Sequence, residues 1–222
     1  MCVYDTTAPD GLPGGSPHIH LACSEAYVVT GGRGAVQTLS GAGFAEHELT
    51  AGTVLWFTPG TVHRLVNRGN LELFVIMANT GLPEAGDAVL TFPAEVLADP
   101  DAYAAAAALP DGGAPGTDPV AAYRRRDLAI AGFQQLVAGG PAALAGFHRA
   151  AVALKREQAD AWHLRWATGA LAAAKHTGEH LAALREGDPA HLAEAAVHAM
   201  PAPRERGRLG MCGLLDTYPV SP

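Results

Sequence analysis

The first half of the chain alternates short apolar runs with glycine-rich or polar breaks. Segments such as EAYVVTGG, TVLWFTPG and LELFVIMANTG are rich in β-branched and aromatic residues and end in turn residues, which is typical of strands. Their spacing of about 8–12 residues favours an antiparallel sandwich or barrel over alternating strands and helices. The pattern predicts strands at 17–22, 25–31, 34–39, 44–49, 53–58, 62–67, 71–78 and 88–92.

From residue 94 onward the chain becomes rich in alanine and its hydrophobic period becomes helical. The segment PDGGAPGTDP at 110–119 predicts a linker, because proline and glycine interrupt regular structure. Asp118-Pro119 and Asp188-Pro189 have the capping pattern of helix starts, and Gly139-Gly140-Pro141 separates two helices. The expected helices are 94–109, divided at Asp99-Pro100, and 119–138, 141–175, 178–186 and 189–200.

One of these helices carries a hydrophobic stripe that predicts packing against the barrel. The stripe consists of residues spaced mostly by three or four, namely Leu144, Phe147, Ala151, Leu154, Trp162 and Trp166. The tail from 207 to 222 has no helical period, so we expect it to cover an edge of the barrel or the outer face of a sheet, in its own chain or in a partner's. The residues before His18 leave room for one short strand, at Cys2–Thr6. The expected organisation is an α+β fold with a β-barrel at 1–93, a helix and linker at 94–118, a helical region at 119–206 and the tail.

Composition narrows the class of protein. The 222 residues are 49% hydrophobic and 17% charged, which suits a folded chain with a sizeable core. The net charge of −7 argues against a general binder of nucleic acid, and the helical region shows no helix-turn-helix pattern. The sequence has no apolar run of membrane-spanning length, no leader pattern and only three cysteines, without a CxxC pair. These features predict a cytoplasmic protein with no membrane or nucleic-acid partner.

Three histidines and one glutamate carry the chemistry that the sequence suggests. His18 and His20 are two residues apart on a predicted strand and therefore point to the same face. Glu25 begins the next strand, and His63 comes from a distant strand, so all four side chains can converge inside a barrel. Three imidazoles and one carboxylate suit a single divalent ion of iron, manganese, nickel, cobalt or zinc.

The segment from Gly15 to Asn67 resembles the two sequence motifs of the cupin superfamily. His18-Ile19-His20 is followed after four residues by Glu25 and after six more by Gly32, as in the first motif, whose leading glycine is replaced here by Leu12. In the second motif Gly52, Gly60, His63 and Asn67 hold the family spacing, whereas the proline is displaced by one position, to Pro59. The resemblance covers roughly residues 15–80 and implies a jelly-roll barrel that binds a divalent metal through His18, His20, Glu25 and His63.

The resemblance implies a metal-dependent enzyme that acts on a small polar metabolite, such as a sugar or a hydroxy-keto acid. Isomerase or epimerase chemistry and dioxygenase chemistry are both compatible with such a centre. Isomerisation also needs an acid or base, for which Glu46, His47 and Glu48 are the candidates. The alternative is a sensory or ligand-binding cupin without catalysis. With either function, the helical region is a dimerisation module or a lid over the mouth of the barrel. We expect the protein to be a homodimer.

Three further patterns have both a functional and a structural reading. His176-Thr177-Gly178-Glu179-His180 fits the HxxEH pattern of a zinc site, although solvated or packed histidines are the simpler reading. Cys23 is a small core residue or a thiol at the site. Arg124, Arg125 and Arg126 form an anion site, a solvated face or a contact between the two halves.

Overall fold

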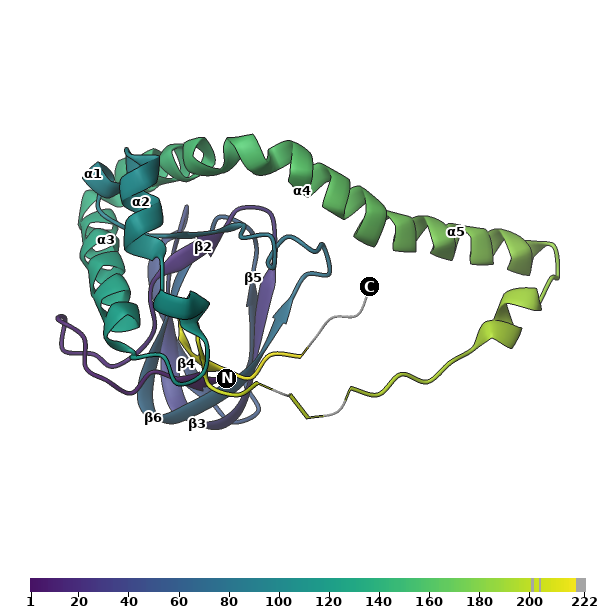
Figure 1. Ribbon diagram of the computed structural model, residues 1–222, viewed down its shortest axis with the longest axis horizontal. Coiled ribbons are helices and arrows are strands. Elements are labelled where there is room, and N and C mark those ends of the chain that lie inside the picture. Colours follow the sequence, from purple (N-terminus) through teal and green to yellow (C-terminus); the bar gives the residue numbers. More distant parts are fainter. Residues whose placement is uncertain (201, 204, 219–222) are drawn as a thin grey trace.

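The computed structural model describes residues 1–200, 202–203 and 205–218. It consists of an antiparallel β-barrel, a layer of helices against one side of the barrel and a long helical arm that projects from it (Figure 1). The strands form one sheet with the order β4-β3-β6-β1-β9-β8. Three further strands pair with members of this sheet or with each other: β2 pairs with β6, β5 pairs with β3, and β7 pairs with β2. Their bounds are β1 Cys2–Val3, β2 His18–His20, β3 Glu25–Ser40, β4 Gly43–Thr50, β5 Val54–Phe57, β6 Val62–Met77, β7 Ala88–Leu90, β8 Arg208–Leu209 and β9 Gly213–Leu215.

Two pairs of predicted strands are single long strands. The segments 25–31 and 34–39 form β3, and the segments 62–67 and 71–78 form β6. The glycine-rich stretches between them bend the strands without ending them, because the β3–β6 ladder continues through register shifts between Val29 and Gly34. The prediction of separate strands was therefore wrong at these two points. The bend curls the sheet around the barrel interior.

The two faces of β6 have different surroundings. His63 and Leu65 point into the barrel, where Leu65 belongs to a core cluster with Tyr27 and Phe57. Val62, one position away, belongs instead to the core that the barrel shares with the helices. This alternation follows from the two-residue period of a strand. It separates the barrel interior, which holds the candidate metal ligands, from the outer face that the helices cover.

The helices differ from the sequence prediction mainly at the C-terminal end. The predicted division at Asp99-Pro100 is confirmed, with Asp99 capping the second helix, and so is the break at Gly140, which has a left-handed backbone (φ 64°). The helix predicted at 189–200 was wrong, because only a short 3-10 turn forms there. The bounds are α1 Ala94–Leu97, α2 Pro100–Ala107, η1 Pro110–Gly113, α3 Val120–Lys155, η2 Arg156–Gln158, α4 Ala159–Trp166, η3 Ala167–Leu171, α5 Ala172–Arg185 and η4 Ala190–Glu194.

Helix α3 joins the helical layer to the barrel. Phe133 and Phe147 are buried in one cluster with Val62 and other residues of the outer sheet face. Two arginines at the start of α3 are also buried: Arg126 donates to the backbone oxygens of Thr6 and Thr7, and Arg125 donates to those of Ala107 and Gly210. They therefore connect the helix to both ends of the chain. Arg125 and Arg126 thus form the predicted contact between the two halves of the chain, and only Arg124 of the three arginines is exposed.

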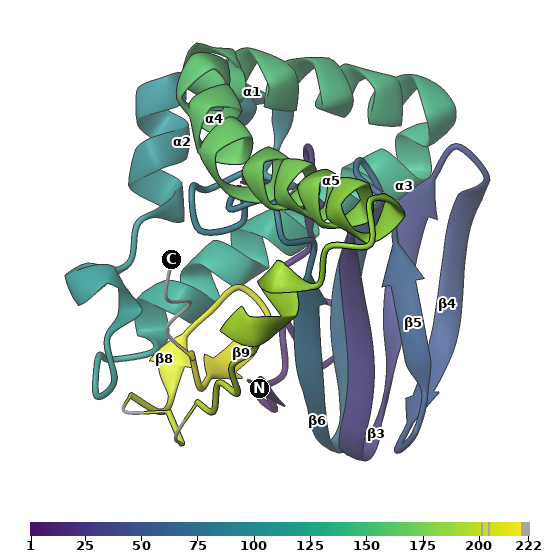
Figure 2. The ribbon, with the colours of Figure 1, turned by 90° about the vertical axis from the view of Figure 1, so that its right-hand side faces the viewer.

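Beyond Lys155 the helix leaves the barrel and becomes the arm, which we define as residues 159–194 (Figures 1 and 2). The predicted stripe is buried at Leu144, Phe147 and Ala151, but Trp162 and Trp166 are only half-buried. Neither α4 nor α5 has a buried residue. By length and composition the run Val120–Arg185 contains an 18-residue window apolar enough to cross a membrane, of which 28% is buried. Core helices meet the same criterion, so the expected absence of a membrane partner stays a prediction.

The described part of the C-terminal tail, up to residue 218, returns to the barrel, and residues 219–222 of the predicted tail lie outside the described residues. Strand β9 pairs with β1, where Cys2 lies opposite Leu214, and β1 in turn pairs with β6. A Cβ atom at Gly213 would lie 2.1 Å from the backbone oxygen of Cys2, so only glycine allows the strands to approach this closely. The tail thus extends the sheet beyond β1 and covers an edge that would otherwise expose unpaired backbone groups.

Candidate metal centre

The structure brings the four predicted ligands together inside the barrel. The donor atoms of His18, His20, Glu25 and His63 all lie within 4.8 Å of one another, and all four residues are buried. Strand pairing explains this arrangement, because His18 on β2 lies directly opposite His63 on β6, and Glu25 begins the neighbouring strand β3.

The histidines direct the same nitrogen, Nε2, toward the centre of the group. The Nδ1 atom of His18 lies 2.9 Å from the backbone oxygen of Ser16, and that of His63 lies 3.1 Å from the backbone oxygen of Thr61. A carbonyl oxygen only accepts hydrogen bonds, so in both rings Nδ1 carries the proton. When the rings are neutral, the Nε2 lone pairs of His18 and His63 are therefore free, and they face each other at 3.0 Å.

These contacts fit a bound cation. Two nitrogen lone pairs at 3.0 Å repel each other unless a positive charge lies beside both. Two donors that each lie about 2.0–2.1 Å from one ion, at a right angle, are about 3 Å apart. The Oε2 atom of Glu25 lies 3.0 Å from Nε2 of His63 and 3.3 Å from Nε2 of His20, in the same range. The residues therefore suit a divalent metal, with Glu25 supplying the negative charge.

Asp87 supports the centre and was missed by the sequence analysis. Its Oδ1 atom lies 2.7 Å from Nδ1 of His20, and its Oδ2 atom accepts hydrogen bonds from the backbone of Ala22 and Cys23. A carboxylate behind a metal-binding histidine fixes the orientation of the ring and raises its basicity. No motif marks Asp87, because its role depends on the loop before β7 returning to the end of β2.

Burial and the neighbouring charges shift the ionisation of the group in opposite directions. Burial, helped by His63 and His20, holds the pKa of His18 well below its usual range. Burial also opposes protonation of His20, but hydrogen bonds to Asp87 and Glu25 outweigh it and raise its pKa to about 9. The pKa of Glu25 is lowered, because the histidines outweigh the effect of burial. Glu25 is thus ionised, and a proton and a metal compete for Nε2 of His20.

Aromatic rings form one wall of the centre. The ring of Phe57 stacks on His63, with centroids 4.2 Å apart and planes 25° apart. Tyr27 lies edge-on to Phe57, and its buried hydroxyl has no hydrogen-bond partner among the residues that the structure describes. Phe57 covers one face of the His63 ring, and the hydroxyl of Tyr27 is buried inside the barrel near Glu25.

The helical region lies over the loops that surround His20. The backbone nitrogen of Gly60 donates to the oxygen of His20, and Nε2 of His148 in α3 lies 2.9 Å from the oxygen of Gly60. At the start of the arm, Trp162 donates to the oxygen of Ala85, two residues before Asp87. His20 is 7% exposed, against 1% for His63. Of the three candidate histidine ligands, His20 is therefore the least deeply buried, and it lies beside the loops that contact α3 and the arm.

The three candidate acid or base residues on β4 separate onto two faces. Glu46 and Glu48 both form ion pairs with Arg68, so their carboxylates are already occupied. His47 lies opposite Val36, and Thr38, two residues along β3, lies opposite His63. His47 is therefore on the same face of the sheet as the metal ligands, with Nε2 3.5 Å from Oγ1 of Thr38.

Cys23 is a core residue rather than a reactive thiol. Its Sγ atom lies 2.9 Å from Oγ1 of Thr80, and its backbone is held by Asp87. Burial raises the pKa of the thiol to about 11, so the nucleophilic thiolate is scarce at neutral pH. The three cysteines are all free.

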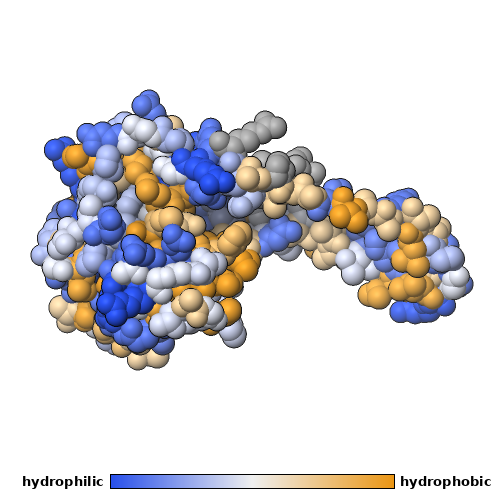
Figure 3. Space-filling view, turned by 90° about the horizontal axis from the view of Figure 1, so that it is seen from below, coloured by the Kyte–Doolittle hydropathy of each residue, from blue (hydrophilic) through white to orange (hydrophobic). Residues whose placement is uncertain are grey.

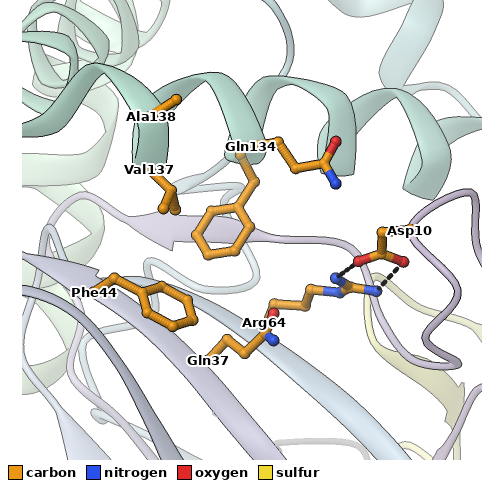
Figure 4. Close-up of a pocket in the computed structure, with 8 residues that line it drawn as sticks. Asp10, Gln37, Phe44, Arg64, Gln134, Val137 and Ala138 are labelled. Atoms are coloured by element: carbon orange, nitrogen blue, oxygen red, sulfur yellow. Dashed lines mark hydrogen bonds and ion pairs between the residues drawn. The ribbon is translucent and has the colours of Figure 1, made fainter.

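A separate cavity of about 290 Å³ lies between α3 and the outer sheet face (Figure 4). Phe44 and Val137 line it, and at one end the buried guanidinium of Arg64 is paired with Asp10. Arg64 neighbours His63 in sequence but points to the opposite face of β6. The cavity is therefore not the entrance to the metal centre.

Comparison with known proteins agrees with this architecture. Residues 6–78 match the family model described as the cupin domain. This part of the chain is a cupin domain. The match ends before the loop of Asp87 and before the helices. None of the curated proteins compared with the chain matches it.

Several solved structures resemble the cupin domain over about a third of this chain. The TDP-quinovose 3,4-ketoisomerase WlaRB from Campylobacter jejuni is 14% identical with a TM-score of 0.30, and the similarity covers 36% of this chain and 60% of that one. Oxalate oxidase in complex with glycolate is 26% identical with a TM-score of 0.26, covering 32% and 36%. The capsular polysaccharide assembling protein CapF from Staphylococcus aureus is 23% identical with a TM-score of 0.25, covering 30% and 20%. This chain therefore spans less than two thirds of each of these proteins.

Proposed function

We propose that this chain is a metal-dependent enzyme that acts on a small polar metabolite bound beside His20. The observation that carries the proposal is the convergence of three imidazole nitrogens and one carboxylate oxygen within 4.8 Å, with the opposite ring nitrogens of the histidines held by Ser16, Thr61 and Asp87. A divalent ion held there supplies a Lewis acid and a template for substrate oxygens. Iron, manganese, nickel, cobalt and zinc all suit this donor set.

The residues around the centre favour a substrate that carries adjacent oxygens and a negative charge. Lys155, at the end of α3, is half-buried, and burial lowers the pKa of its ammonium group, an effect that the negative charge of Asp87 partly offsets. We infer that this ammonium group attracts an anionic substrate, such as a hydroxy-keto acid or a sugar acid. Phe57 covers one face of the His63 ring.

His47 is the candidate for moving a proton during isomerisation. It lies on the ligand face of the sheet and is exposed, and its Nε2 atom lies 3.5 Å from Oγ1 of Thr38, the residue opposite His63. A neutral imidazole accepts a proton from a substrate carbon beside a carbonyl and returns it at the next position. The carboxylates of Glu46 and Glu48 are paired with Arg68 and do not compete for this role.

Two measurements separate the two reaction types. Protein loaded with each of the five metals is incubated with panels of sugars and hydroxy-keto acids in D2O and in aerated buffer. Isomerase chemistry incorporates solvent deuterium into the substrate, whereas dioxygenase chemistry consumes O2. His47→Asn is expected to retain the metal and to lose deuterium exchange by about 10²–10⁴-fold. Thermal stabilisation by a metabolite without either signal identifies a ligand-binding protein and contradicts the enzyme.

We also propose that two copies of the chain pair through the outer face of β5, β3 and β6. Trp56 on β5 is 71% exposed, and Phe74 and Ile76 on β6 are 54% and 53% exposed. Both strands pair with β3, where Ala26 lies opposite Trp56 and Ile76, so these side chains form one continuous apolar surface. Exposed apolar patches of this kind mark association surfaces. Light scattering is expected to show a dimer, and Trp56→Ser with Phe74→Ser a monomer that keeps its metal.

A further inference from the structure

A group of three histidines and one glutamate lies at the far end of the arm, away from the barrel (Figure 1). His176, Glu179 and His180 come from α5, and His191 comes from the turn η4 that follows it. The ring centroids of His176 and His180 are 4.3 Å apart, and those of His180 and His191 are 4.5 Å apart. The HxxEH pattern of the sequence thus acquires a third imidazole that its spacing did not reveal.

The chain reversal after α5 brings His191 to this place. Gly187 adopts a left-handed backbone (φ 75°), and the backbone nitrogen of Asp188 donates to the oxygen of Ala183, which folds the chain back along the helix. The side chain of Asp188 then caps the backbone nitrogen of Ala190 and starts the 3-10 turn. The reversal is therefore fixed by backbone geometry, and it places His191 over the ring of His180.

Hydrophobic burial does not explain why the turn lies against the helix. Leu184 on α5 and Leu192 on η4 are 55% and 60% exposed, and Figure 3 shows hydrophobic side chains on the surface of the arm. What the two segments share instead is the stacked pair His180 and His191, whose planes are 16° apart. Because an imidazole lone pair lies in the ring plane, one of these rings must turn before both can bind the same ion. The Nδ1 atom of His191 is buried and has no hydrogen-bond partner among the described residues. A buried donor or acceptor without a partner is costly unless a ligand satisfies it.

We propose that His176, His180 and His191 form a second divalent-metal site that clamps the turn η4 onto α5. Imidazole groups select zinc, copper, nickel and cobalt over the harder ions magnesium and calcium. Histidines at i and i+4 share one face of a helix, so His176 and His180 reach the same ion. The Oε2 atom of Glu179 lies 3.0 Å from Nδ1 of His176 and completes the set as a ligand or as the group that orients this ring.

The arm site differs from the barrel centre in ways that an experiment can separate. His176 and Glu179 have side chains that are 64% and 74% exposed, whereas the barrel ligands are buried. Exposed side chains must be ordered when the ion binds, so the arm site is the weaker of the two. It shares no residue with the barrel centre, and its occupancy does not depend on the proposed enzymatic activity.

The test is a zinc titration of untagged full-length protein against a coloured chelator. The native chain is expected to bind two ions, His63→Ala to keep only the arm ion, and His180→Asn to keep only the barrel ion. His191→Asn is expected to weaken the arm ion by about tenfold or more. The matched control is His198→Asn, an exposed histidine a few residues beyond the turn, which is expected to keep both ions.

Hydrogen exchange supplies a second readout that does not depend on counting ions. Zinc added to His63→Ala is expected to slow exchange of the backbone amides of 188–194, and His180→Asn in the same chain is expected to abolish this protection. A single zinc equivalent in the native chain that disappears with His63→Ala overturns the proposal. The proposal is also overturned if the native chain binds a second zinc ion that His180→Asn and His191→Asn both retain. The same holds if His198→Asn loses the second ion to the same extent as His180→Asn.

Discussion

The Nδ1 atom of His20 lies 2.7 Å from Oδ1 of Asp87, which comes from a loop 67 residues further along the chain. This contact holds the most exposed of the three barrel imidazoles in place and directs its Nε2 atom toward Glu25. It also links the metal centre to the loop on which the arm rests, because Trp162 donates to Ala85 in the same loop. The ligand set and the helical region are thus connected through one carboxylate.

Replacing Asp87 tests this connection. Asp87→Asn removes the negative charge behind His20 but keeps its shape, and we expect the affinity of the barrel for its metal to fall by about 10–100-fold. The control is Glu84→Gln, an exposed acidic residue of the same loop. Equal affinities for the two variants, measured by chelator competition, would contradict a role for Asp87 at the centre.

Removing one ligand is expected to empty the barrel centre. His63→Ala leaves donors from one local segment only, His18 to Glu25, so metal analysis of the purified protein should show most of the barrel metal lost. His47→Ala changes a histidine on the same sheet face that lies outside the ligand group, and it should retain about one ion per chain in the barrel. Full retention of this ion in His63→Ala would refute the ligand assignment.

The contact between α3 and the barrel is expected to account for a large part of the stability. Phe147 is 3% exposed and belongs to the core cluster shared with the sheet, so Phe147→Ala should lower the free energy of unfolding by about 3–5 kcal/mol. Val152, on the same helix, is 55% exposed, and Val152→Ala should change this free energy by less than about 0.5 kcal/mol. Urea denaturation measures both, and similar values would show that α3 does not depend on the barrel.

The pairing of β9 with β1 depends on the absence of a side chain at one position. Gly213→Ala places a Cβ atom against the backbone oxygen of Cys2, so the tail must move away from the sheet. We expect faster hydrogen exchange at the amides of β1 and β9 and lower solubility. Gly41→Ala, at a turn where nothing lies within 4 Å of the added atom, should change neither.

The ion pair between Asp10 and Arg64 predicts a pH dependence of stability. Partial burial opposes ionisation of Asp10, but Arg64 outweighs it and lowers the pKa of the carboxyl below its ordinary value of 3.8. Because the pKa of Asp10 is lower in the folded state than in the unfolded chain, its ionisation stabilises the fold at pH values above 3.8. This contribution is lost as the pH falls through the pKa of the folded state. Urea midpoints of the native chain and of Asp10→Asn should therefore differ at neutral pH and converge in acid. Asp5→Asn, an exposed neighbour, should follow the native chain.

The local sequence determined the parts of this protein that depend on short-range periodicity and spacing. The HxH pair, Glu25 and His63 were identified because the two-residue period of a strand and the cupin spacing place them on one face. The helix cap at Asp99 and the break at Gly140 were identified for the same reason, since capping and left-handed backbone are properties of a few adjacent residues. The helix predicted at 189–200 failed, because the chain after the reversal at Gly187 forms only the short turn η4.

Only the tertiary structure decided which distant groups meet. The reversal at Gly187 that brings His191 to His180 is local, whereas Asp87 reaches His20 through a loop whose geometry no residue pattern encodes. The same is true of the face to which each β4 side chain points, because the pairing register of β3 and β4 assigns His47 to the metal face and leaves Glu46 to Arg68. A register shift of one residue would exchange these roles. The sequence thus specifies the ligands, whereas long-range pairing specifies what surrounds them.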